Sequence, residues 1–179
     1  DLNGLKIIHG DILLQEIEDL PINNPVRIIG NIPYNITSPI IFWLIEQLDY
    51  WDDAFIMMQK EVAQRLTAQV GTKEYSRISV VVGAYLNMEM CFKISPEVFI
   101  PRPKVESAII RFTKKDSPVV ADNKYVKFNK IVKAAFSKRR KMLRNSLNDF
   151  DIPISIQEEI DFTRRPETLS IEEFAKLLH

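Results

Sequence analysis

The chain has 179 residues, of which 46% are hydrophobic and 27% charged, the ordinary composition of a soluble globular protein. Its 24 basic and 24 acidic residues cancel, so the charge of the whole chain predicts no polyanionic partner. The single cysteine, Cys91, excludes an internal disulfide framework and is expected to be a buried apolar thiol. No apolar stretch approaches the length of a membrane span, which predicts a cytoplasmic protein without a membrane partner.

Short apolar runs alternate with helical patterns over the first two thirds of the chain. The runs predict strands at 5–10, 26–31, 53–59 and 106–112, and the patterns predict helices at 38–48, 60–70 and 76–86. This alternation indicates an α/β sheet that is largely parallel. The run at 26–31 is apolar on both faces, as expected of a central strand.

Only helical signals follow the polar bridge at 113–122. An apolar stripe at helical spacing comprises Phe128, Ile131, Val132, Ala135 and Phe136. Near the end of the chain, Ser170 and Glu173 are spaced as a capping box. The sequence therefore predicts an α/β domain at 1–113 and a small all-helical domain at 123–179.

The tetrapeptide Asn31-Ile32-Pro33-Tyr34 ends the strand predicted at 26–31, and α/β sheets bind ligands at such ends. The exocyclic amine of adenine is a poor nucleophile because its lone pair is delocalised into the ring. The side-chain carbonyl of Asn31 and the main-chain carbonyl of Ile32 could accept its two N–H groups and favour the pyramidal geometry of attack. Pro33 would stiffen the turn, and the ring of Tyr34 offers a stacking face. A plain strand-ending turn remains the alternative.

A second candidate segment spans 95–112, and three prolines within eight of its residues make a stiff connector that cannot pair as a central strand. Phe99 is expected to project from it, with Arg102 and Lys104 as basic neighbours. An aromatic side chain with such neighbours suits a nucleic-acid base and its phosphate. The alternative is a proline-rich crossover that tucks Phe99 into the core.

A third candidate segment concentrates positive charge, because no acidic residue lies between Asp122 and Asp149. Such a surface suits a phosphate backbone, whereas solvated helix faces usually mix the two signs of charge. The candidate RNA contacts are Lys138, Arg139, Arg140, Lys141 and Arg144. A merely solvated helix face is the alternative.

Asp11 follows the strand predicted at 5–10, where a carboxylate could bind an amino group or ribose hydroxyl of a nucleotide-like cofactor. An aspartate in this position is more often a turn or helix cap. His9 and His179 lack the clustered partners that a metal site needs, so no metal ligand is predicted.

Taken together, the segments resemble the ribosomal RNA adenine-N6 dimethyltransferase family, which methylates small-subunit rRNA with S-adenosylmethionine. The matching stretches are "HGDIL", "GNIPYNITSPI", "MMQKEVAQRL", "FIPRPKVESAIIRF", "AFSKRRKMLRNSL" and "RRPETLSIEEFAKLL". They occur in the expected order over nearly the whole chain. The resemblance implies an incomplete Rossmann-like methyltransferase sheet in 1–113 and an rRNA-binding helical domain in 123–179.

The resemblance also implies residue roles. Asn31 and the Ile32 carbonyl would bind the target amine, while Tyr34 and Phe99 would sandwich the adenine ring. Asp11 would contact the adenine of S-adenosylmethionine, and Asn31 would lie close to this cofactor. The basic segment would bind small-subunit rRNA in the assembling ribosomal subunit, where family members dimethylate two adjacent adenosines.

One departure from the family pattern is large: the chain has five glycines and no Gly-x-Gly, whereas the family binds the cofactor with a Gly-rich loop. We therefore expect a C-terminal portion of such an enzyme that binds S-adenosylmethionine poorly, is inactive by itself and self-associates through exposed apolar surface. Two other functions remain open. One is the large-subunit methyltransferase of macrolide resistance, and the other is a non-catalytic ribosome-assembly or transcription factor.

Overall fold

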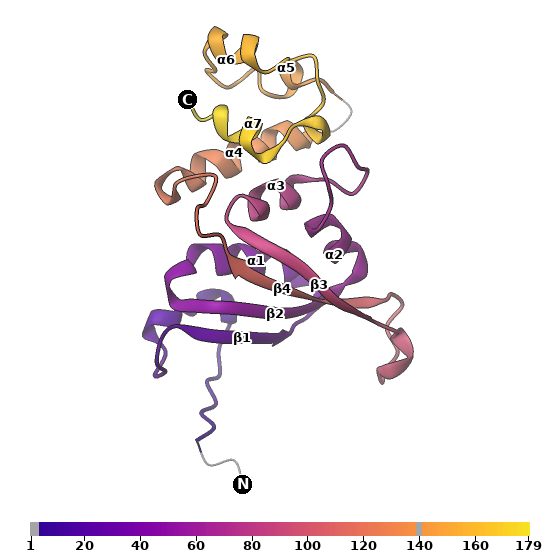
Figure 1. The fold of residues 1–179 in the computed structure, drawn as a ribbon. Helices are drawn as coiled ribbons and strands as arrows, with labels where there is room; N and C mark the ends of the chain where they lie inside the picture. Colours follow the sequence, from indigo (N-terminus) through magenta and orange to yellow (C-terminus); the bar gives the residue numbers. More distant parts are fainter. Residues whose placement is uncertain (1–3, 139–140) are drawn as a thin grey trace.

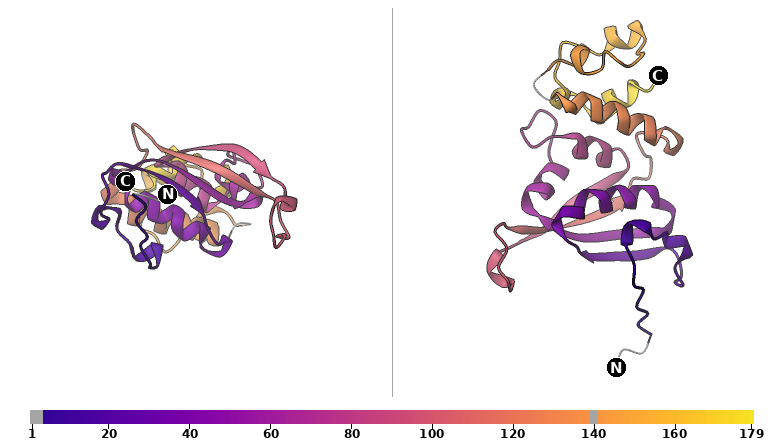
Figure 2. Two further views of the ribbon diagram at one scale, coloured as in Figure 1. Left: turned by 90° about the horizontal axis from the view of Figure 1, so that it is seen from below. Right: turned by 180° about the vertical axis from the view of Figure 1, so that it is seen from behind.

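The computed structural model describes residues 4–138 and 141–179. Its four-stranded sheet has the order β1 (Val26–Asn31), β2 (Trp51–Gln59), β4 (Ser107–Lys114) and β3 (Leu86–Ile94). The helices α1 (Thr37–Glu46), α2 (Lys60–Leu66) and α3 (Arg77–Gly83) lie over one face of this sheet (Figures 1 and 2). Beyond them stack α4 (Tyr125–Ser137), α5 (Leu143–Ser146), α6 (Ile154–Glu159) and α7 (Ile171–Lys176).

The sheet buries one face and leaves the other uncovered by helices. Ile28, Ala54 and Phe112 are aligned across β1, β2 and β4, and Ala54 and Phe112 have no exposed surface. Since side chains alternate along a strand, the neighbouring Ile29 points to the opposite face, where it is 78% exposed. The sheet thus packs as a two-layer structure within the described chain.

The helical tail continues the same core. The stripe predicted on α4 is confirmed, because Phe128, Ile131, Val132 and Ala135 are all fully buried. Phe136 stacks on Phe174 of α7 with ring centroids 5.8 Å apart. The predicted capping box is confirmed as well, since Ser170 and Glu173 each bond to the other's main-chain N–H group at the start of α7.

Three expectations about the sheet are wrong. Residues 5–10 form no strand, because within the described residues no strand pairs with them, and Ile7 is 86% exposed. The sheet is not largely parallel: β1 and β2 run parallel, but β2 and β3 each pair antiparallel with β4. Nor is β1 a central strand, since it lies at the edge of the sheet.

The strand β3 escaped the sequence interpretation, which assigned Leu86 to a helix and passed over the residues after it. Along β3 the side chains of Met88 and Met90 are half-buried, while those of Asn87 and Glu89 are exposed, which is a strand alternation. A register shift between Met90 and Phe92 makes Cys91 the extra residue of a bulge. The prediction of a buried cysteine is therefore wrong, because Cys91 is exposed.

Within the described residues, no helix combines the length and the apolar character that crossing a membrane requires.

Candidate functional site

A shallow pocket of about 250 Å³ lies where β1 ends, beside the loop that joins β3 to β4. It is lined by all five residues predicted to form the amine site, namely Asn31, Ile32, Pro33, Tyr34 and Phe99. Met57, Pro101 and Pro103 complete the lining of this pocket, which is named the amine pocket after the role predicted for it. The fold therefore joins two segments that are more than sixty positions apart in the sequence.

The position of Asn31 follows from the pairing of β1 with β2. Asn31 is the last residue of β1, is exposed, and lies in register with Met57 of β2. Gly30 leaves room for the side chain of Ile56 on β2, because a Cβ at this position would lie 2.8 Å from the Cδ1 atom of Ile56. Sequence reasoning missed Met57, although it belongs to "MMQKEVAQRL", one of the stretches that carry the family resemblance.

Tyr34 is held in a fixed orientation by hydrogen bonds at both ends. Its hydroxyl group lies 2.6 Å from Oγ of Ser107, a fully buried residue at the start of β4. Its main-chain carbonyl accepts a bond of 3.1 Å from Oγ1 of Thr37 in the first turn of α1. The ring is half-buried and lines the pocket, where a flat ligand could contact it.

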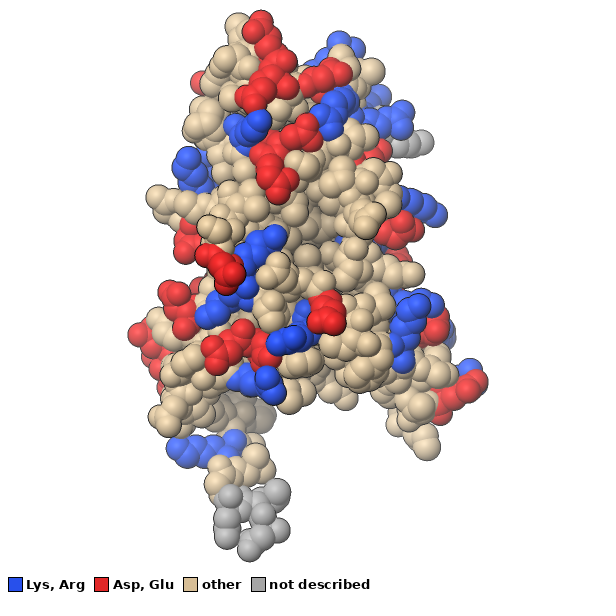
Figure 3. Space-filling model, in the orientation of Figure 1, with Lys and Arg blue, Asp and Glu red and all other residues tan. Residues whose placement is uncertain are grey.

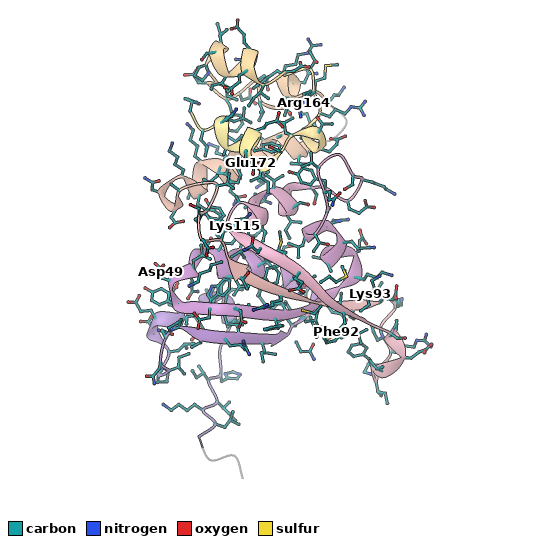
Figure 4. All side chains as sticks on the ribbon, in the orientation of Figure 1. Asp49, Phe92, Lys93, Lys115, Arg164 and Glu172 are labelled. Carbon is teal, nitrogen blue, oxygen red and sulfur yellow. The ribbon has the colours of Figure 1, made fainter. Side chains whose placement is uncertain are left out.

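Phe99 is far from Tyr34 in the sequence but lines the same pocket. Ser95 caps a short 3₁₀ turn, Pro96–Val98, and the N–H group of Phe99 donates to the carbonyl of Pro96 at 3.3 Å, which closes that turn. The loop projects past the sheet, next to Phe92 and Lys93 at the end of β3 (Figure 4). Phe99 is half-buried and does not belong to the hydrophobic core, which disfavours the alternative of a core phenylalanine.

An ion pair and a main-chain hydrogen bond join Lys60 to Glu106, at the end of the loop that carries Phe99. Lys60 begins α2, and its N–H group donates to the Glu106 carbonyl at 2.9 Å while its ammonium group pairs with the Glu106 carboxylate. The hydrogen bond from Lys60 lowers the pKa of the Glu106 carboxyl group. These contacts join the end of β2 to the start of β4, where Ser107 anchors Tyr34.

The two basic residues predicted beside Phe99 do not line the amine pocket. Arg102 is exposed and pairs with Glu97 at 3.2 Å within the same loop. Lys104 is exposed and lines a separate pocket with Lys60 and Glu106. Both side chains are accessible to a polyanion, but the loop's own carboxylates already neutralise part of this charge.

The candidate RNA contacts of the helical tail are exposed where the structure describes them. Lys138 caps the end of α4, Lys141 follows, and Arg144 lies on α5. Arg139 and Arg140 lie outside the described residues. Figure 3 shows blue side chains gathered at the upper right, in the region of α4 and α5.

Asp11 acts as a cap rather than as part of the amine pocket. Its carboxylate accepts the N–H group of Leu13 at 3.0 Å and begins the 3₁₀ turn Ile12–Leu14. The segment is then fixed to α1, because the carbonyl of Gln15 accepts the indole N–H of Trp43 at 2.8 Å. Since 5–10 is no strand, Asp11 does not stand at a strand end as predicted.

Among the residues that the structure describes, no three His, Cys, Asp or Glu side chains are grouped so that they could hold a metal ion.

Known proteins that resemble this chain identify its family. A model of the ribosomal RNA adenine dimethylase family matches residues 3–177. The ribosomal RNA small subunit methyltransferase A of Saccharophagus degradans is 45% identical over 178 residues, which cover 98% of this chain and 66% of that protein. The protein of the same name from Xylella fastidiosa is 41% identical, with 98% of this chain and 68% of that protein covered. The chain thus spans about two thirds of the length of these curated relatives.

Two solved structures share the fold. A dimethyladenosine transferase from Plasmodium falciparum superposes with a TM-score of 0.80 at 25% identity, covering 98% of this chain and 71% of that one. The 23S rRNA methyltransferase ErmE superposes with a TM-score of 0.68 at 24% identity, covering 99% and 73%. The second likeness concerns the fold alone.

Proposed function

Because the chain belongs to the ribosomal RNA adenine dimethylase family, we propose that it carries the methyl-acceptor site of a small-subunit rRNA adenine dimethyltransferase. The observation that supports this most directly is the single pocket formed by Asn31, Ile32, Pro33, Tyr34 and Phe99. Its proposed product is N6,N6-dimethyladenosine at two adjacent adenosines, formed with S-adenosylmethionine as the methyl donor.

The pocket offers the target base two aromatic rings and two carbonyl groups. Tyr34 and Phe99 stack on the adenine, and this kind of contact is worth about 1–3 kcal/mol per base. The carbonyls of Asn31 and Ile32 accept the two N–H groups of the exocyclic amine, which orients its lone pair toward an incoming methyl group. Methyl transfer to an amine depends mainly on such positioning, because the alkylated nitrogen loses its proton readily.

The residues of this chain fit the methyl donor only in part. Asn31 is exposed at the pocket and available to a cofactor, but the carboxylate of Asp11 already caps a turn. The sequence also contains no Gly-x-Gly. We expect the 179-residue chain to bind S-adenosylmethionine weakly, with no saturation at 1 mM in isothermal titration calorimetry. Submicromolar binding would contradict this.

The RNA-binding surface proposed for the helical domain, residues 123–179, comprises the exposed Lys138, Lys141 and Arg144, with Arg139 and Arg140 between them in sequence. Arg102 and Lys104 would contact the RNA near the target adenosine. The partner is small-subunit rRNA in the assembling subunit, and the compartment is the cytoplasm.

The two other functions are less well supported. The likeness to the 23S rRNA methyltransferase ErmE is weaker in superposition than that to the dimethyladenosine transferase, with TM-scores of 0.68 and 0.80. A non-catalytic assembly or transcription factor would not need Asn31 and Tyr34 at one pocket.

The test measures methyl transfer by the full-length protein that contains these 179 residues. It uses labelled S-adenosylmethionine and small ribosomal subunits that lack the modification. Asn31→Ala is expected to lower methyl transfer by about 100-fold or more, since it removes a preorganised acceptor of the reacting amine. Binding of the RNA hairpin should persist. Unchanged transfer in Asn31→Ala would exclude the proposed role of this residue.

We also propose self-association through the uncovered side of the sheet. Ile29 on the edge strand β1 is 78% exposed, and Leu5 and Ile7 in the preceding segment are 60% and 86% exposed. Light scattering at rising protein concentration should report oligomers of the 179-residue chain, and Ile29→Lys should reduce them. A strictly monomeric chain at 100 µM would contradict this proposal.

A further inference from the structure

A second pocket, with a volume of about 240 Å³, opens between α1, α2 and α3. The polar residues that line it are Ser38, Arg65, Ser76 and Arg77, and Phe42 forms one apolar wall. Val62 and Ile78 complete the apolar part, so the lining contains two guanidinium groups, two hydroxyl groups and no carboxylate. The hydroxyl group of Ser76 also lies 3.4 Å from Oγ of Ser79. Its chemistry is therefore that of an anion site.

Arg77 is a preorganised cation. Its Nε and Nη2 atoms donate to Oδ1 of Asn129 on α4, at 3.2 and 2.8 Å. Its guanidinium carbon lies 5.1 Å from the centroid of the Phe42 ring. Both partners are uncharged, and Arg77 forms no ion pair within the described residues. A positive charge is thus fixed in orientation while its remaining N–H donors and its charge stay available.

The other groups complete a cradle. Arg65 pairs with Glu61 one turn earlier on α2, but both side chains are exposed, and such surface pairs are weak and easily exchanged. The hydroxyl group of Ser38 makes no hydrogen bond within the part of the chain that the structure describes. Ser38 also lies in the first turn of the ten-residue helix α1, whose dipole favours negative charge there.

The pocket adjoins the amine site through the chain itself. α1 begins three residues after Tyr34, and Thr37 in its first turn bonds to the Tyr34 carbonyl. α2 begins directly after β2, three residues beyond the strand position that holds Met57. Two of the three helices that form this pocket, α1 and α2, therefore start close to the strand ends that line the amine pocket.

We propose that Ser38, Arg65, Ser76 and Arg77 bind a phosphate group of the RNA backbone next to the adenosine held in the amine pocket. The inference rests on the proposed function for its ligand, since the cradle itself would accept any phosphate. A fixed phosphate would set the register of the strand, so that the base and not its neighbour enters between Tyr34 and Phe99.

The first measurement is an NMR titration of the 179-residue chain that follows the side-chain Nε–H signals of Arg65 and Arg77. One arm uses inorganic phosphate, and the other uses a short RNA hairpin with two adjacent adenosines in its loop. Both ligands are expected to shift these signals, whereas the signal of Arg27, which pairs with Asp53 at 2.7 Å on the sheet, should stay in place.

The second measurement is the salt dependence of hairpin binding. Arg65→Gln together with Arg77→Gln should weaken binding roughly tenfold, as expected for lost charge-assisted hydrogen bonds. The slope of log K against log salt should fall in magnitude by about 0.7, the value for one phosphate on single-stranded RNA. Arg65→Gln alone keeps the Arg77 contacts to α4 and guards against a folding defect, and it should weaken binding in the same direction.

Arg27→Gln is the matched control, because it also removes an exposed arginine that pairs with one carboxylate, and its slope should equal that of the unaltered chain. An unchanged slope in the double variant, with unshifted Arg65 and Arg77 signals, would overturn the phosphate site while leaving the proposed function intact. Shifts with inorganic phosphate but no hairpin binding would instead support the cradle and contradict the RNA function.

Discussion

The two ends of α1 present opposite chemistry. Ser38 in its first turn and Phe42 in its middle line the pocket that contains Arg65 and Arg77. At its end, Glu46 lines a pocket of about 270 Å³ together with Asp49, Asp122, Tyr85 and Tyr125. Asp49 lies on the left flank of the molecule in Figure 4, where Figure 3 shows acidic side chains gathered. The two pockets that α1 lines thus differ in the sign of their charged side chains, although the chain has no net charge.

The difference shows how a neutral protein can direct a polyanion. Positive groups lie at the helix start, where the dipole already favours anions, and the amine pocket lies beside it. The carboxylates at the C-terminal end of α1 repel phosphate. They gain no stability from the helix dipole, because its negative end lies there. These charges would therefore favour one placement of the proposed RNA over another, while the net charge contributes nothing.

After Asn31→Ala, the largest effect on methyl transfer is expected from removing an aromatic ring that lines the amine pocket. Phe99→Ala should lower methyl transfer by the gene product roughly 10- to 100-fold, because stacking on one base contributes about 1–3 kcal/mol. Val98→Ala is the matched control, since Val98 is 69% exposed and does not line the pocket. Equal activity of the two variants would remove Phe99 from the site.

A smaller effect is expected from removing the hydroxyl group of one tyrosine in each region, Tyr34 in the amine pocket and Tyr85 in the acidic pocket. Tyr34→Phe should lower the free energy of unfolding by about 1–2 kcal/mol, because it leaves the buried Ser107 hydroxyl without its 2.6 Å partner. Tyr85→Phe should be neutral or stabilising, because the buried Tyr85 hydroxyl has no hydrogen-bond partner within the described residues. Urea denaturation measures both changes, and a larger loss for Tyr85→Phe would reverse the assignment.

Titration at high pH tests the acidic end. Burial, and then the Glu46 carboxylate, raises the pKa of Tyr125 to about 12, whereas an unperturbed tyrosine ionises near 10. The folded state therefore favours the neutral phenol, and this contribution to stability is complete below pH 10 and is lost as the pH rises toward 12. The difference in phenolate absorbance between the unaltered chain and Tyr125→Phe should show this late ionisation. Glu46→Gln should lower the pH at which it occurs. Ionisation near pH 10 would contradict it.

The smallest effect is expected from charge reversal at the acidic end. Glu46→Lys combined with Asp49→Lys should strengthen hairpin binding only about two- to threefold at 10 mM salt, and not measurably at 150 mM. The groups stay exposed and away from the amine pocket, so salt screens them. A tenfold or greater gain at 150 mM would mean that RNA reaches this end of α1.

Much of the candidate site could be predicted because its chemistry is local. Asn31, Ile32, Pro33 and Tyr34 are consecutive, so a strand end followed by a stiff turn presents them together wherever the strand lies. Phe99 was predictable as a projecting ring from its prolines. Met57 was not, because nothing local marks a strand methionine as a pocket wall until its partner strand is known.

Asp11 shows the opposite case. The same short pattern, an apolar run followed by Gly and Asp, is compatible with a strand end or with a cap. The pattern contains no information about whether another strand supplies hydrogen bonds to the run. Within the described residues none does, and the carboxylate caps the turn that begins at Ile12.

The sequence by itself determined the family, the helical tail and the tetrapeptide proposed to bind the amine, since each depends on side-chain identity at fixed spacing along the chain. Only the tertiary structure decided the strand order β1-β2-β4-β3, the antiparallel pairing of β3 with β4, and the resulting approach of Phe99 to Tyr34. It also decided that two arginines from α2 and α3 share one pocket. Periodicity reports which face of an element is apolar, whereas the choice of partner depends on packing between residues far apart in the chain.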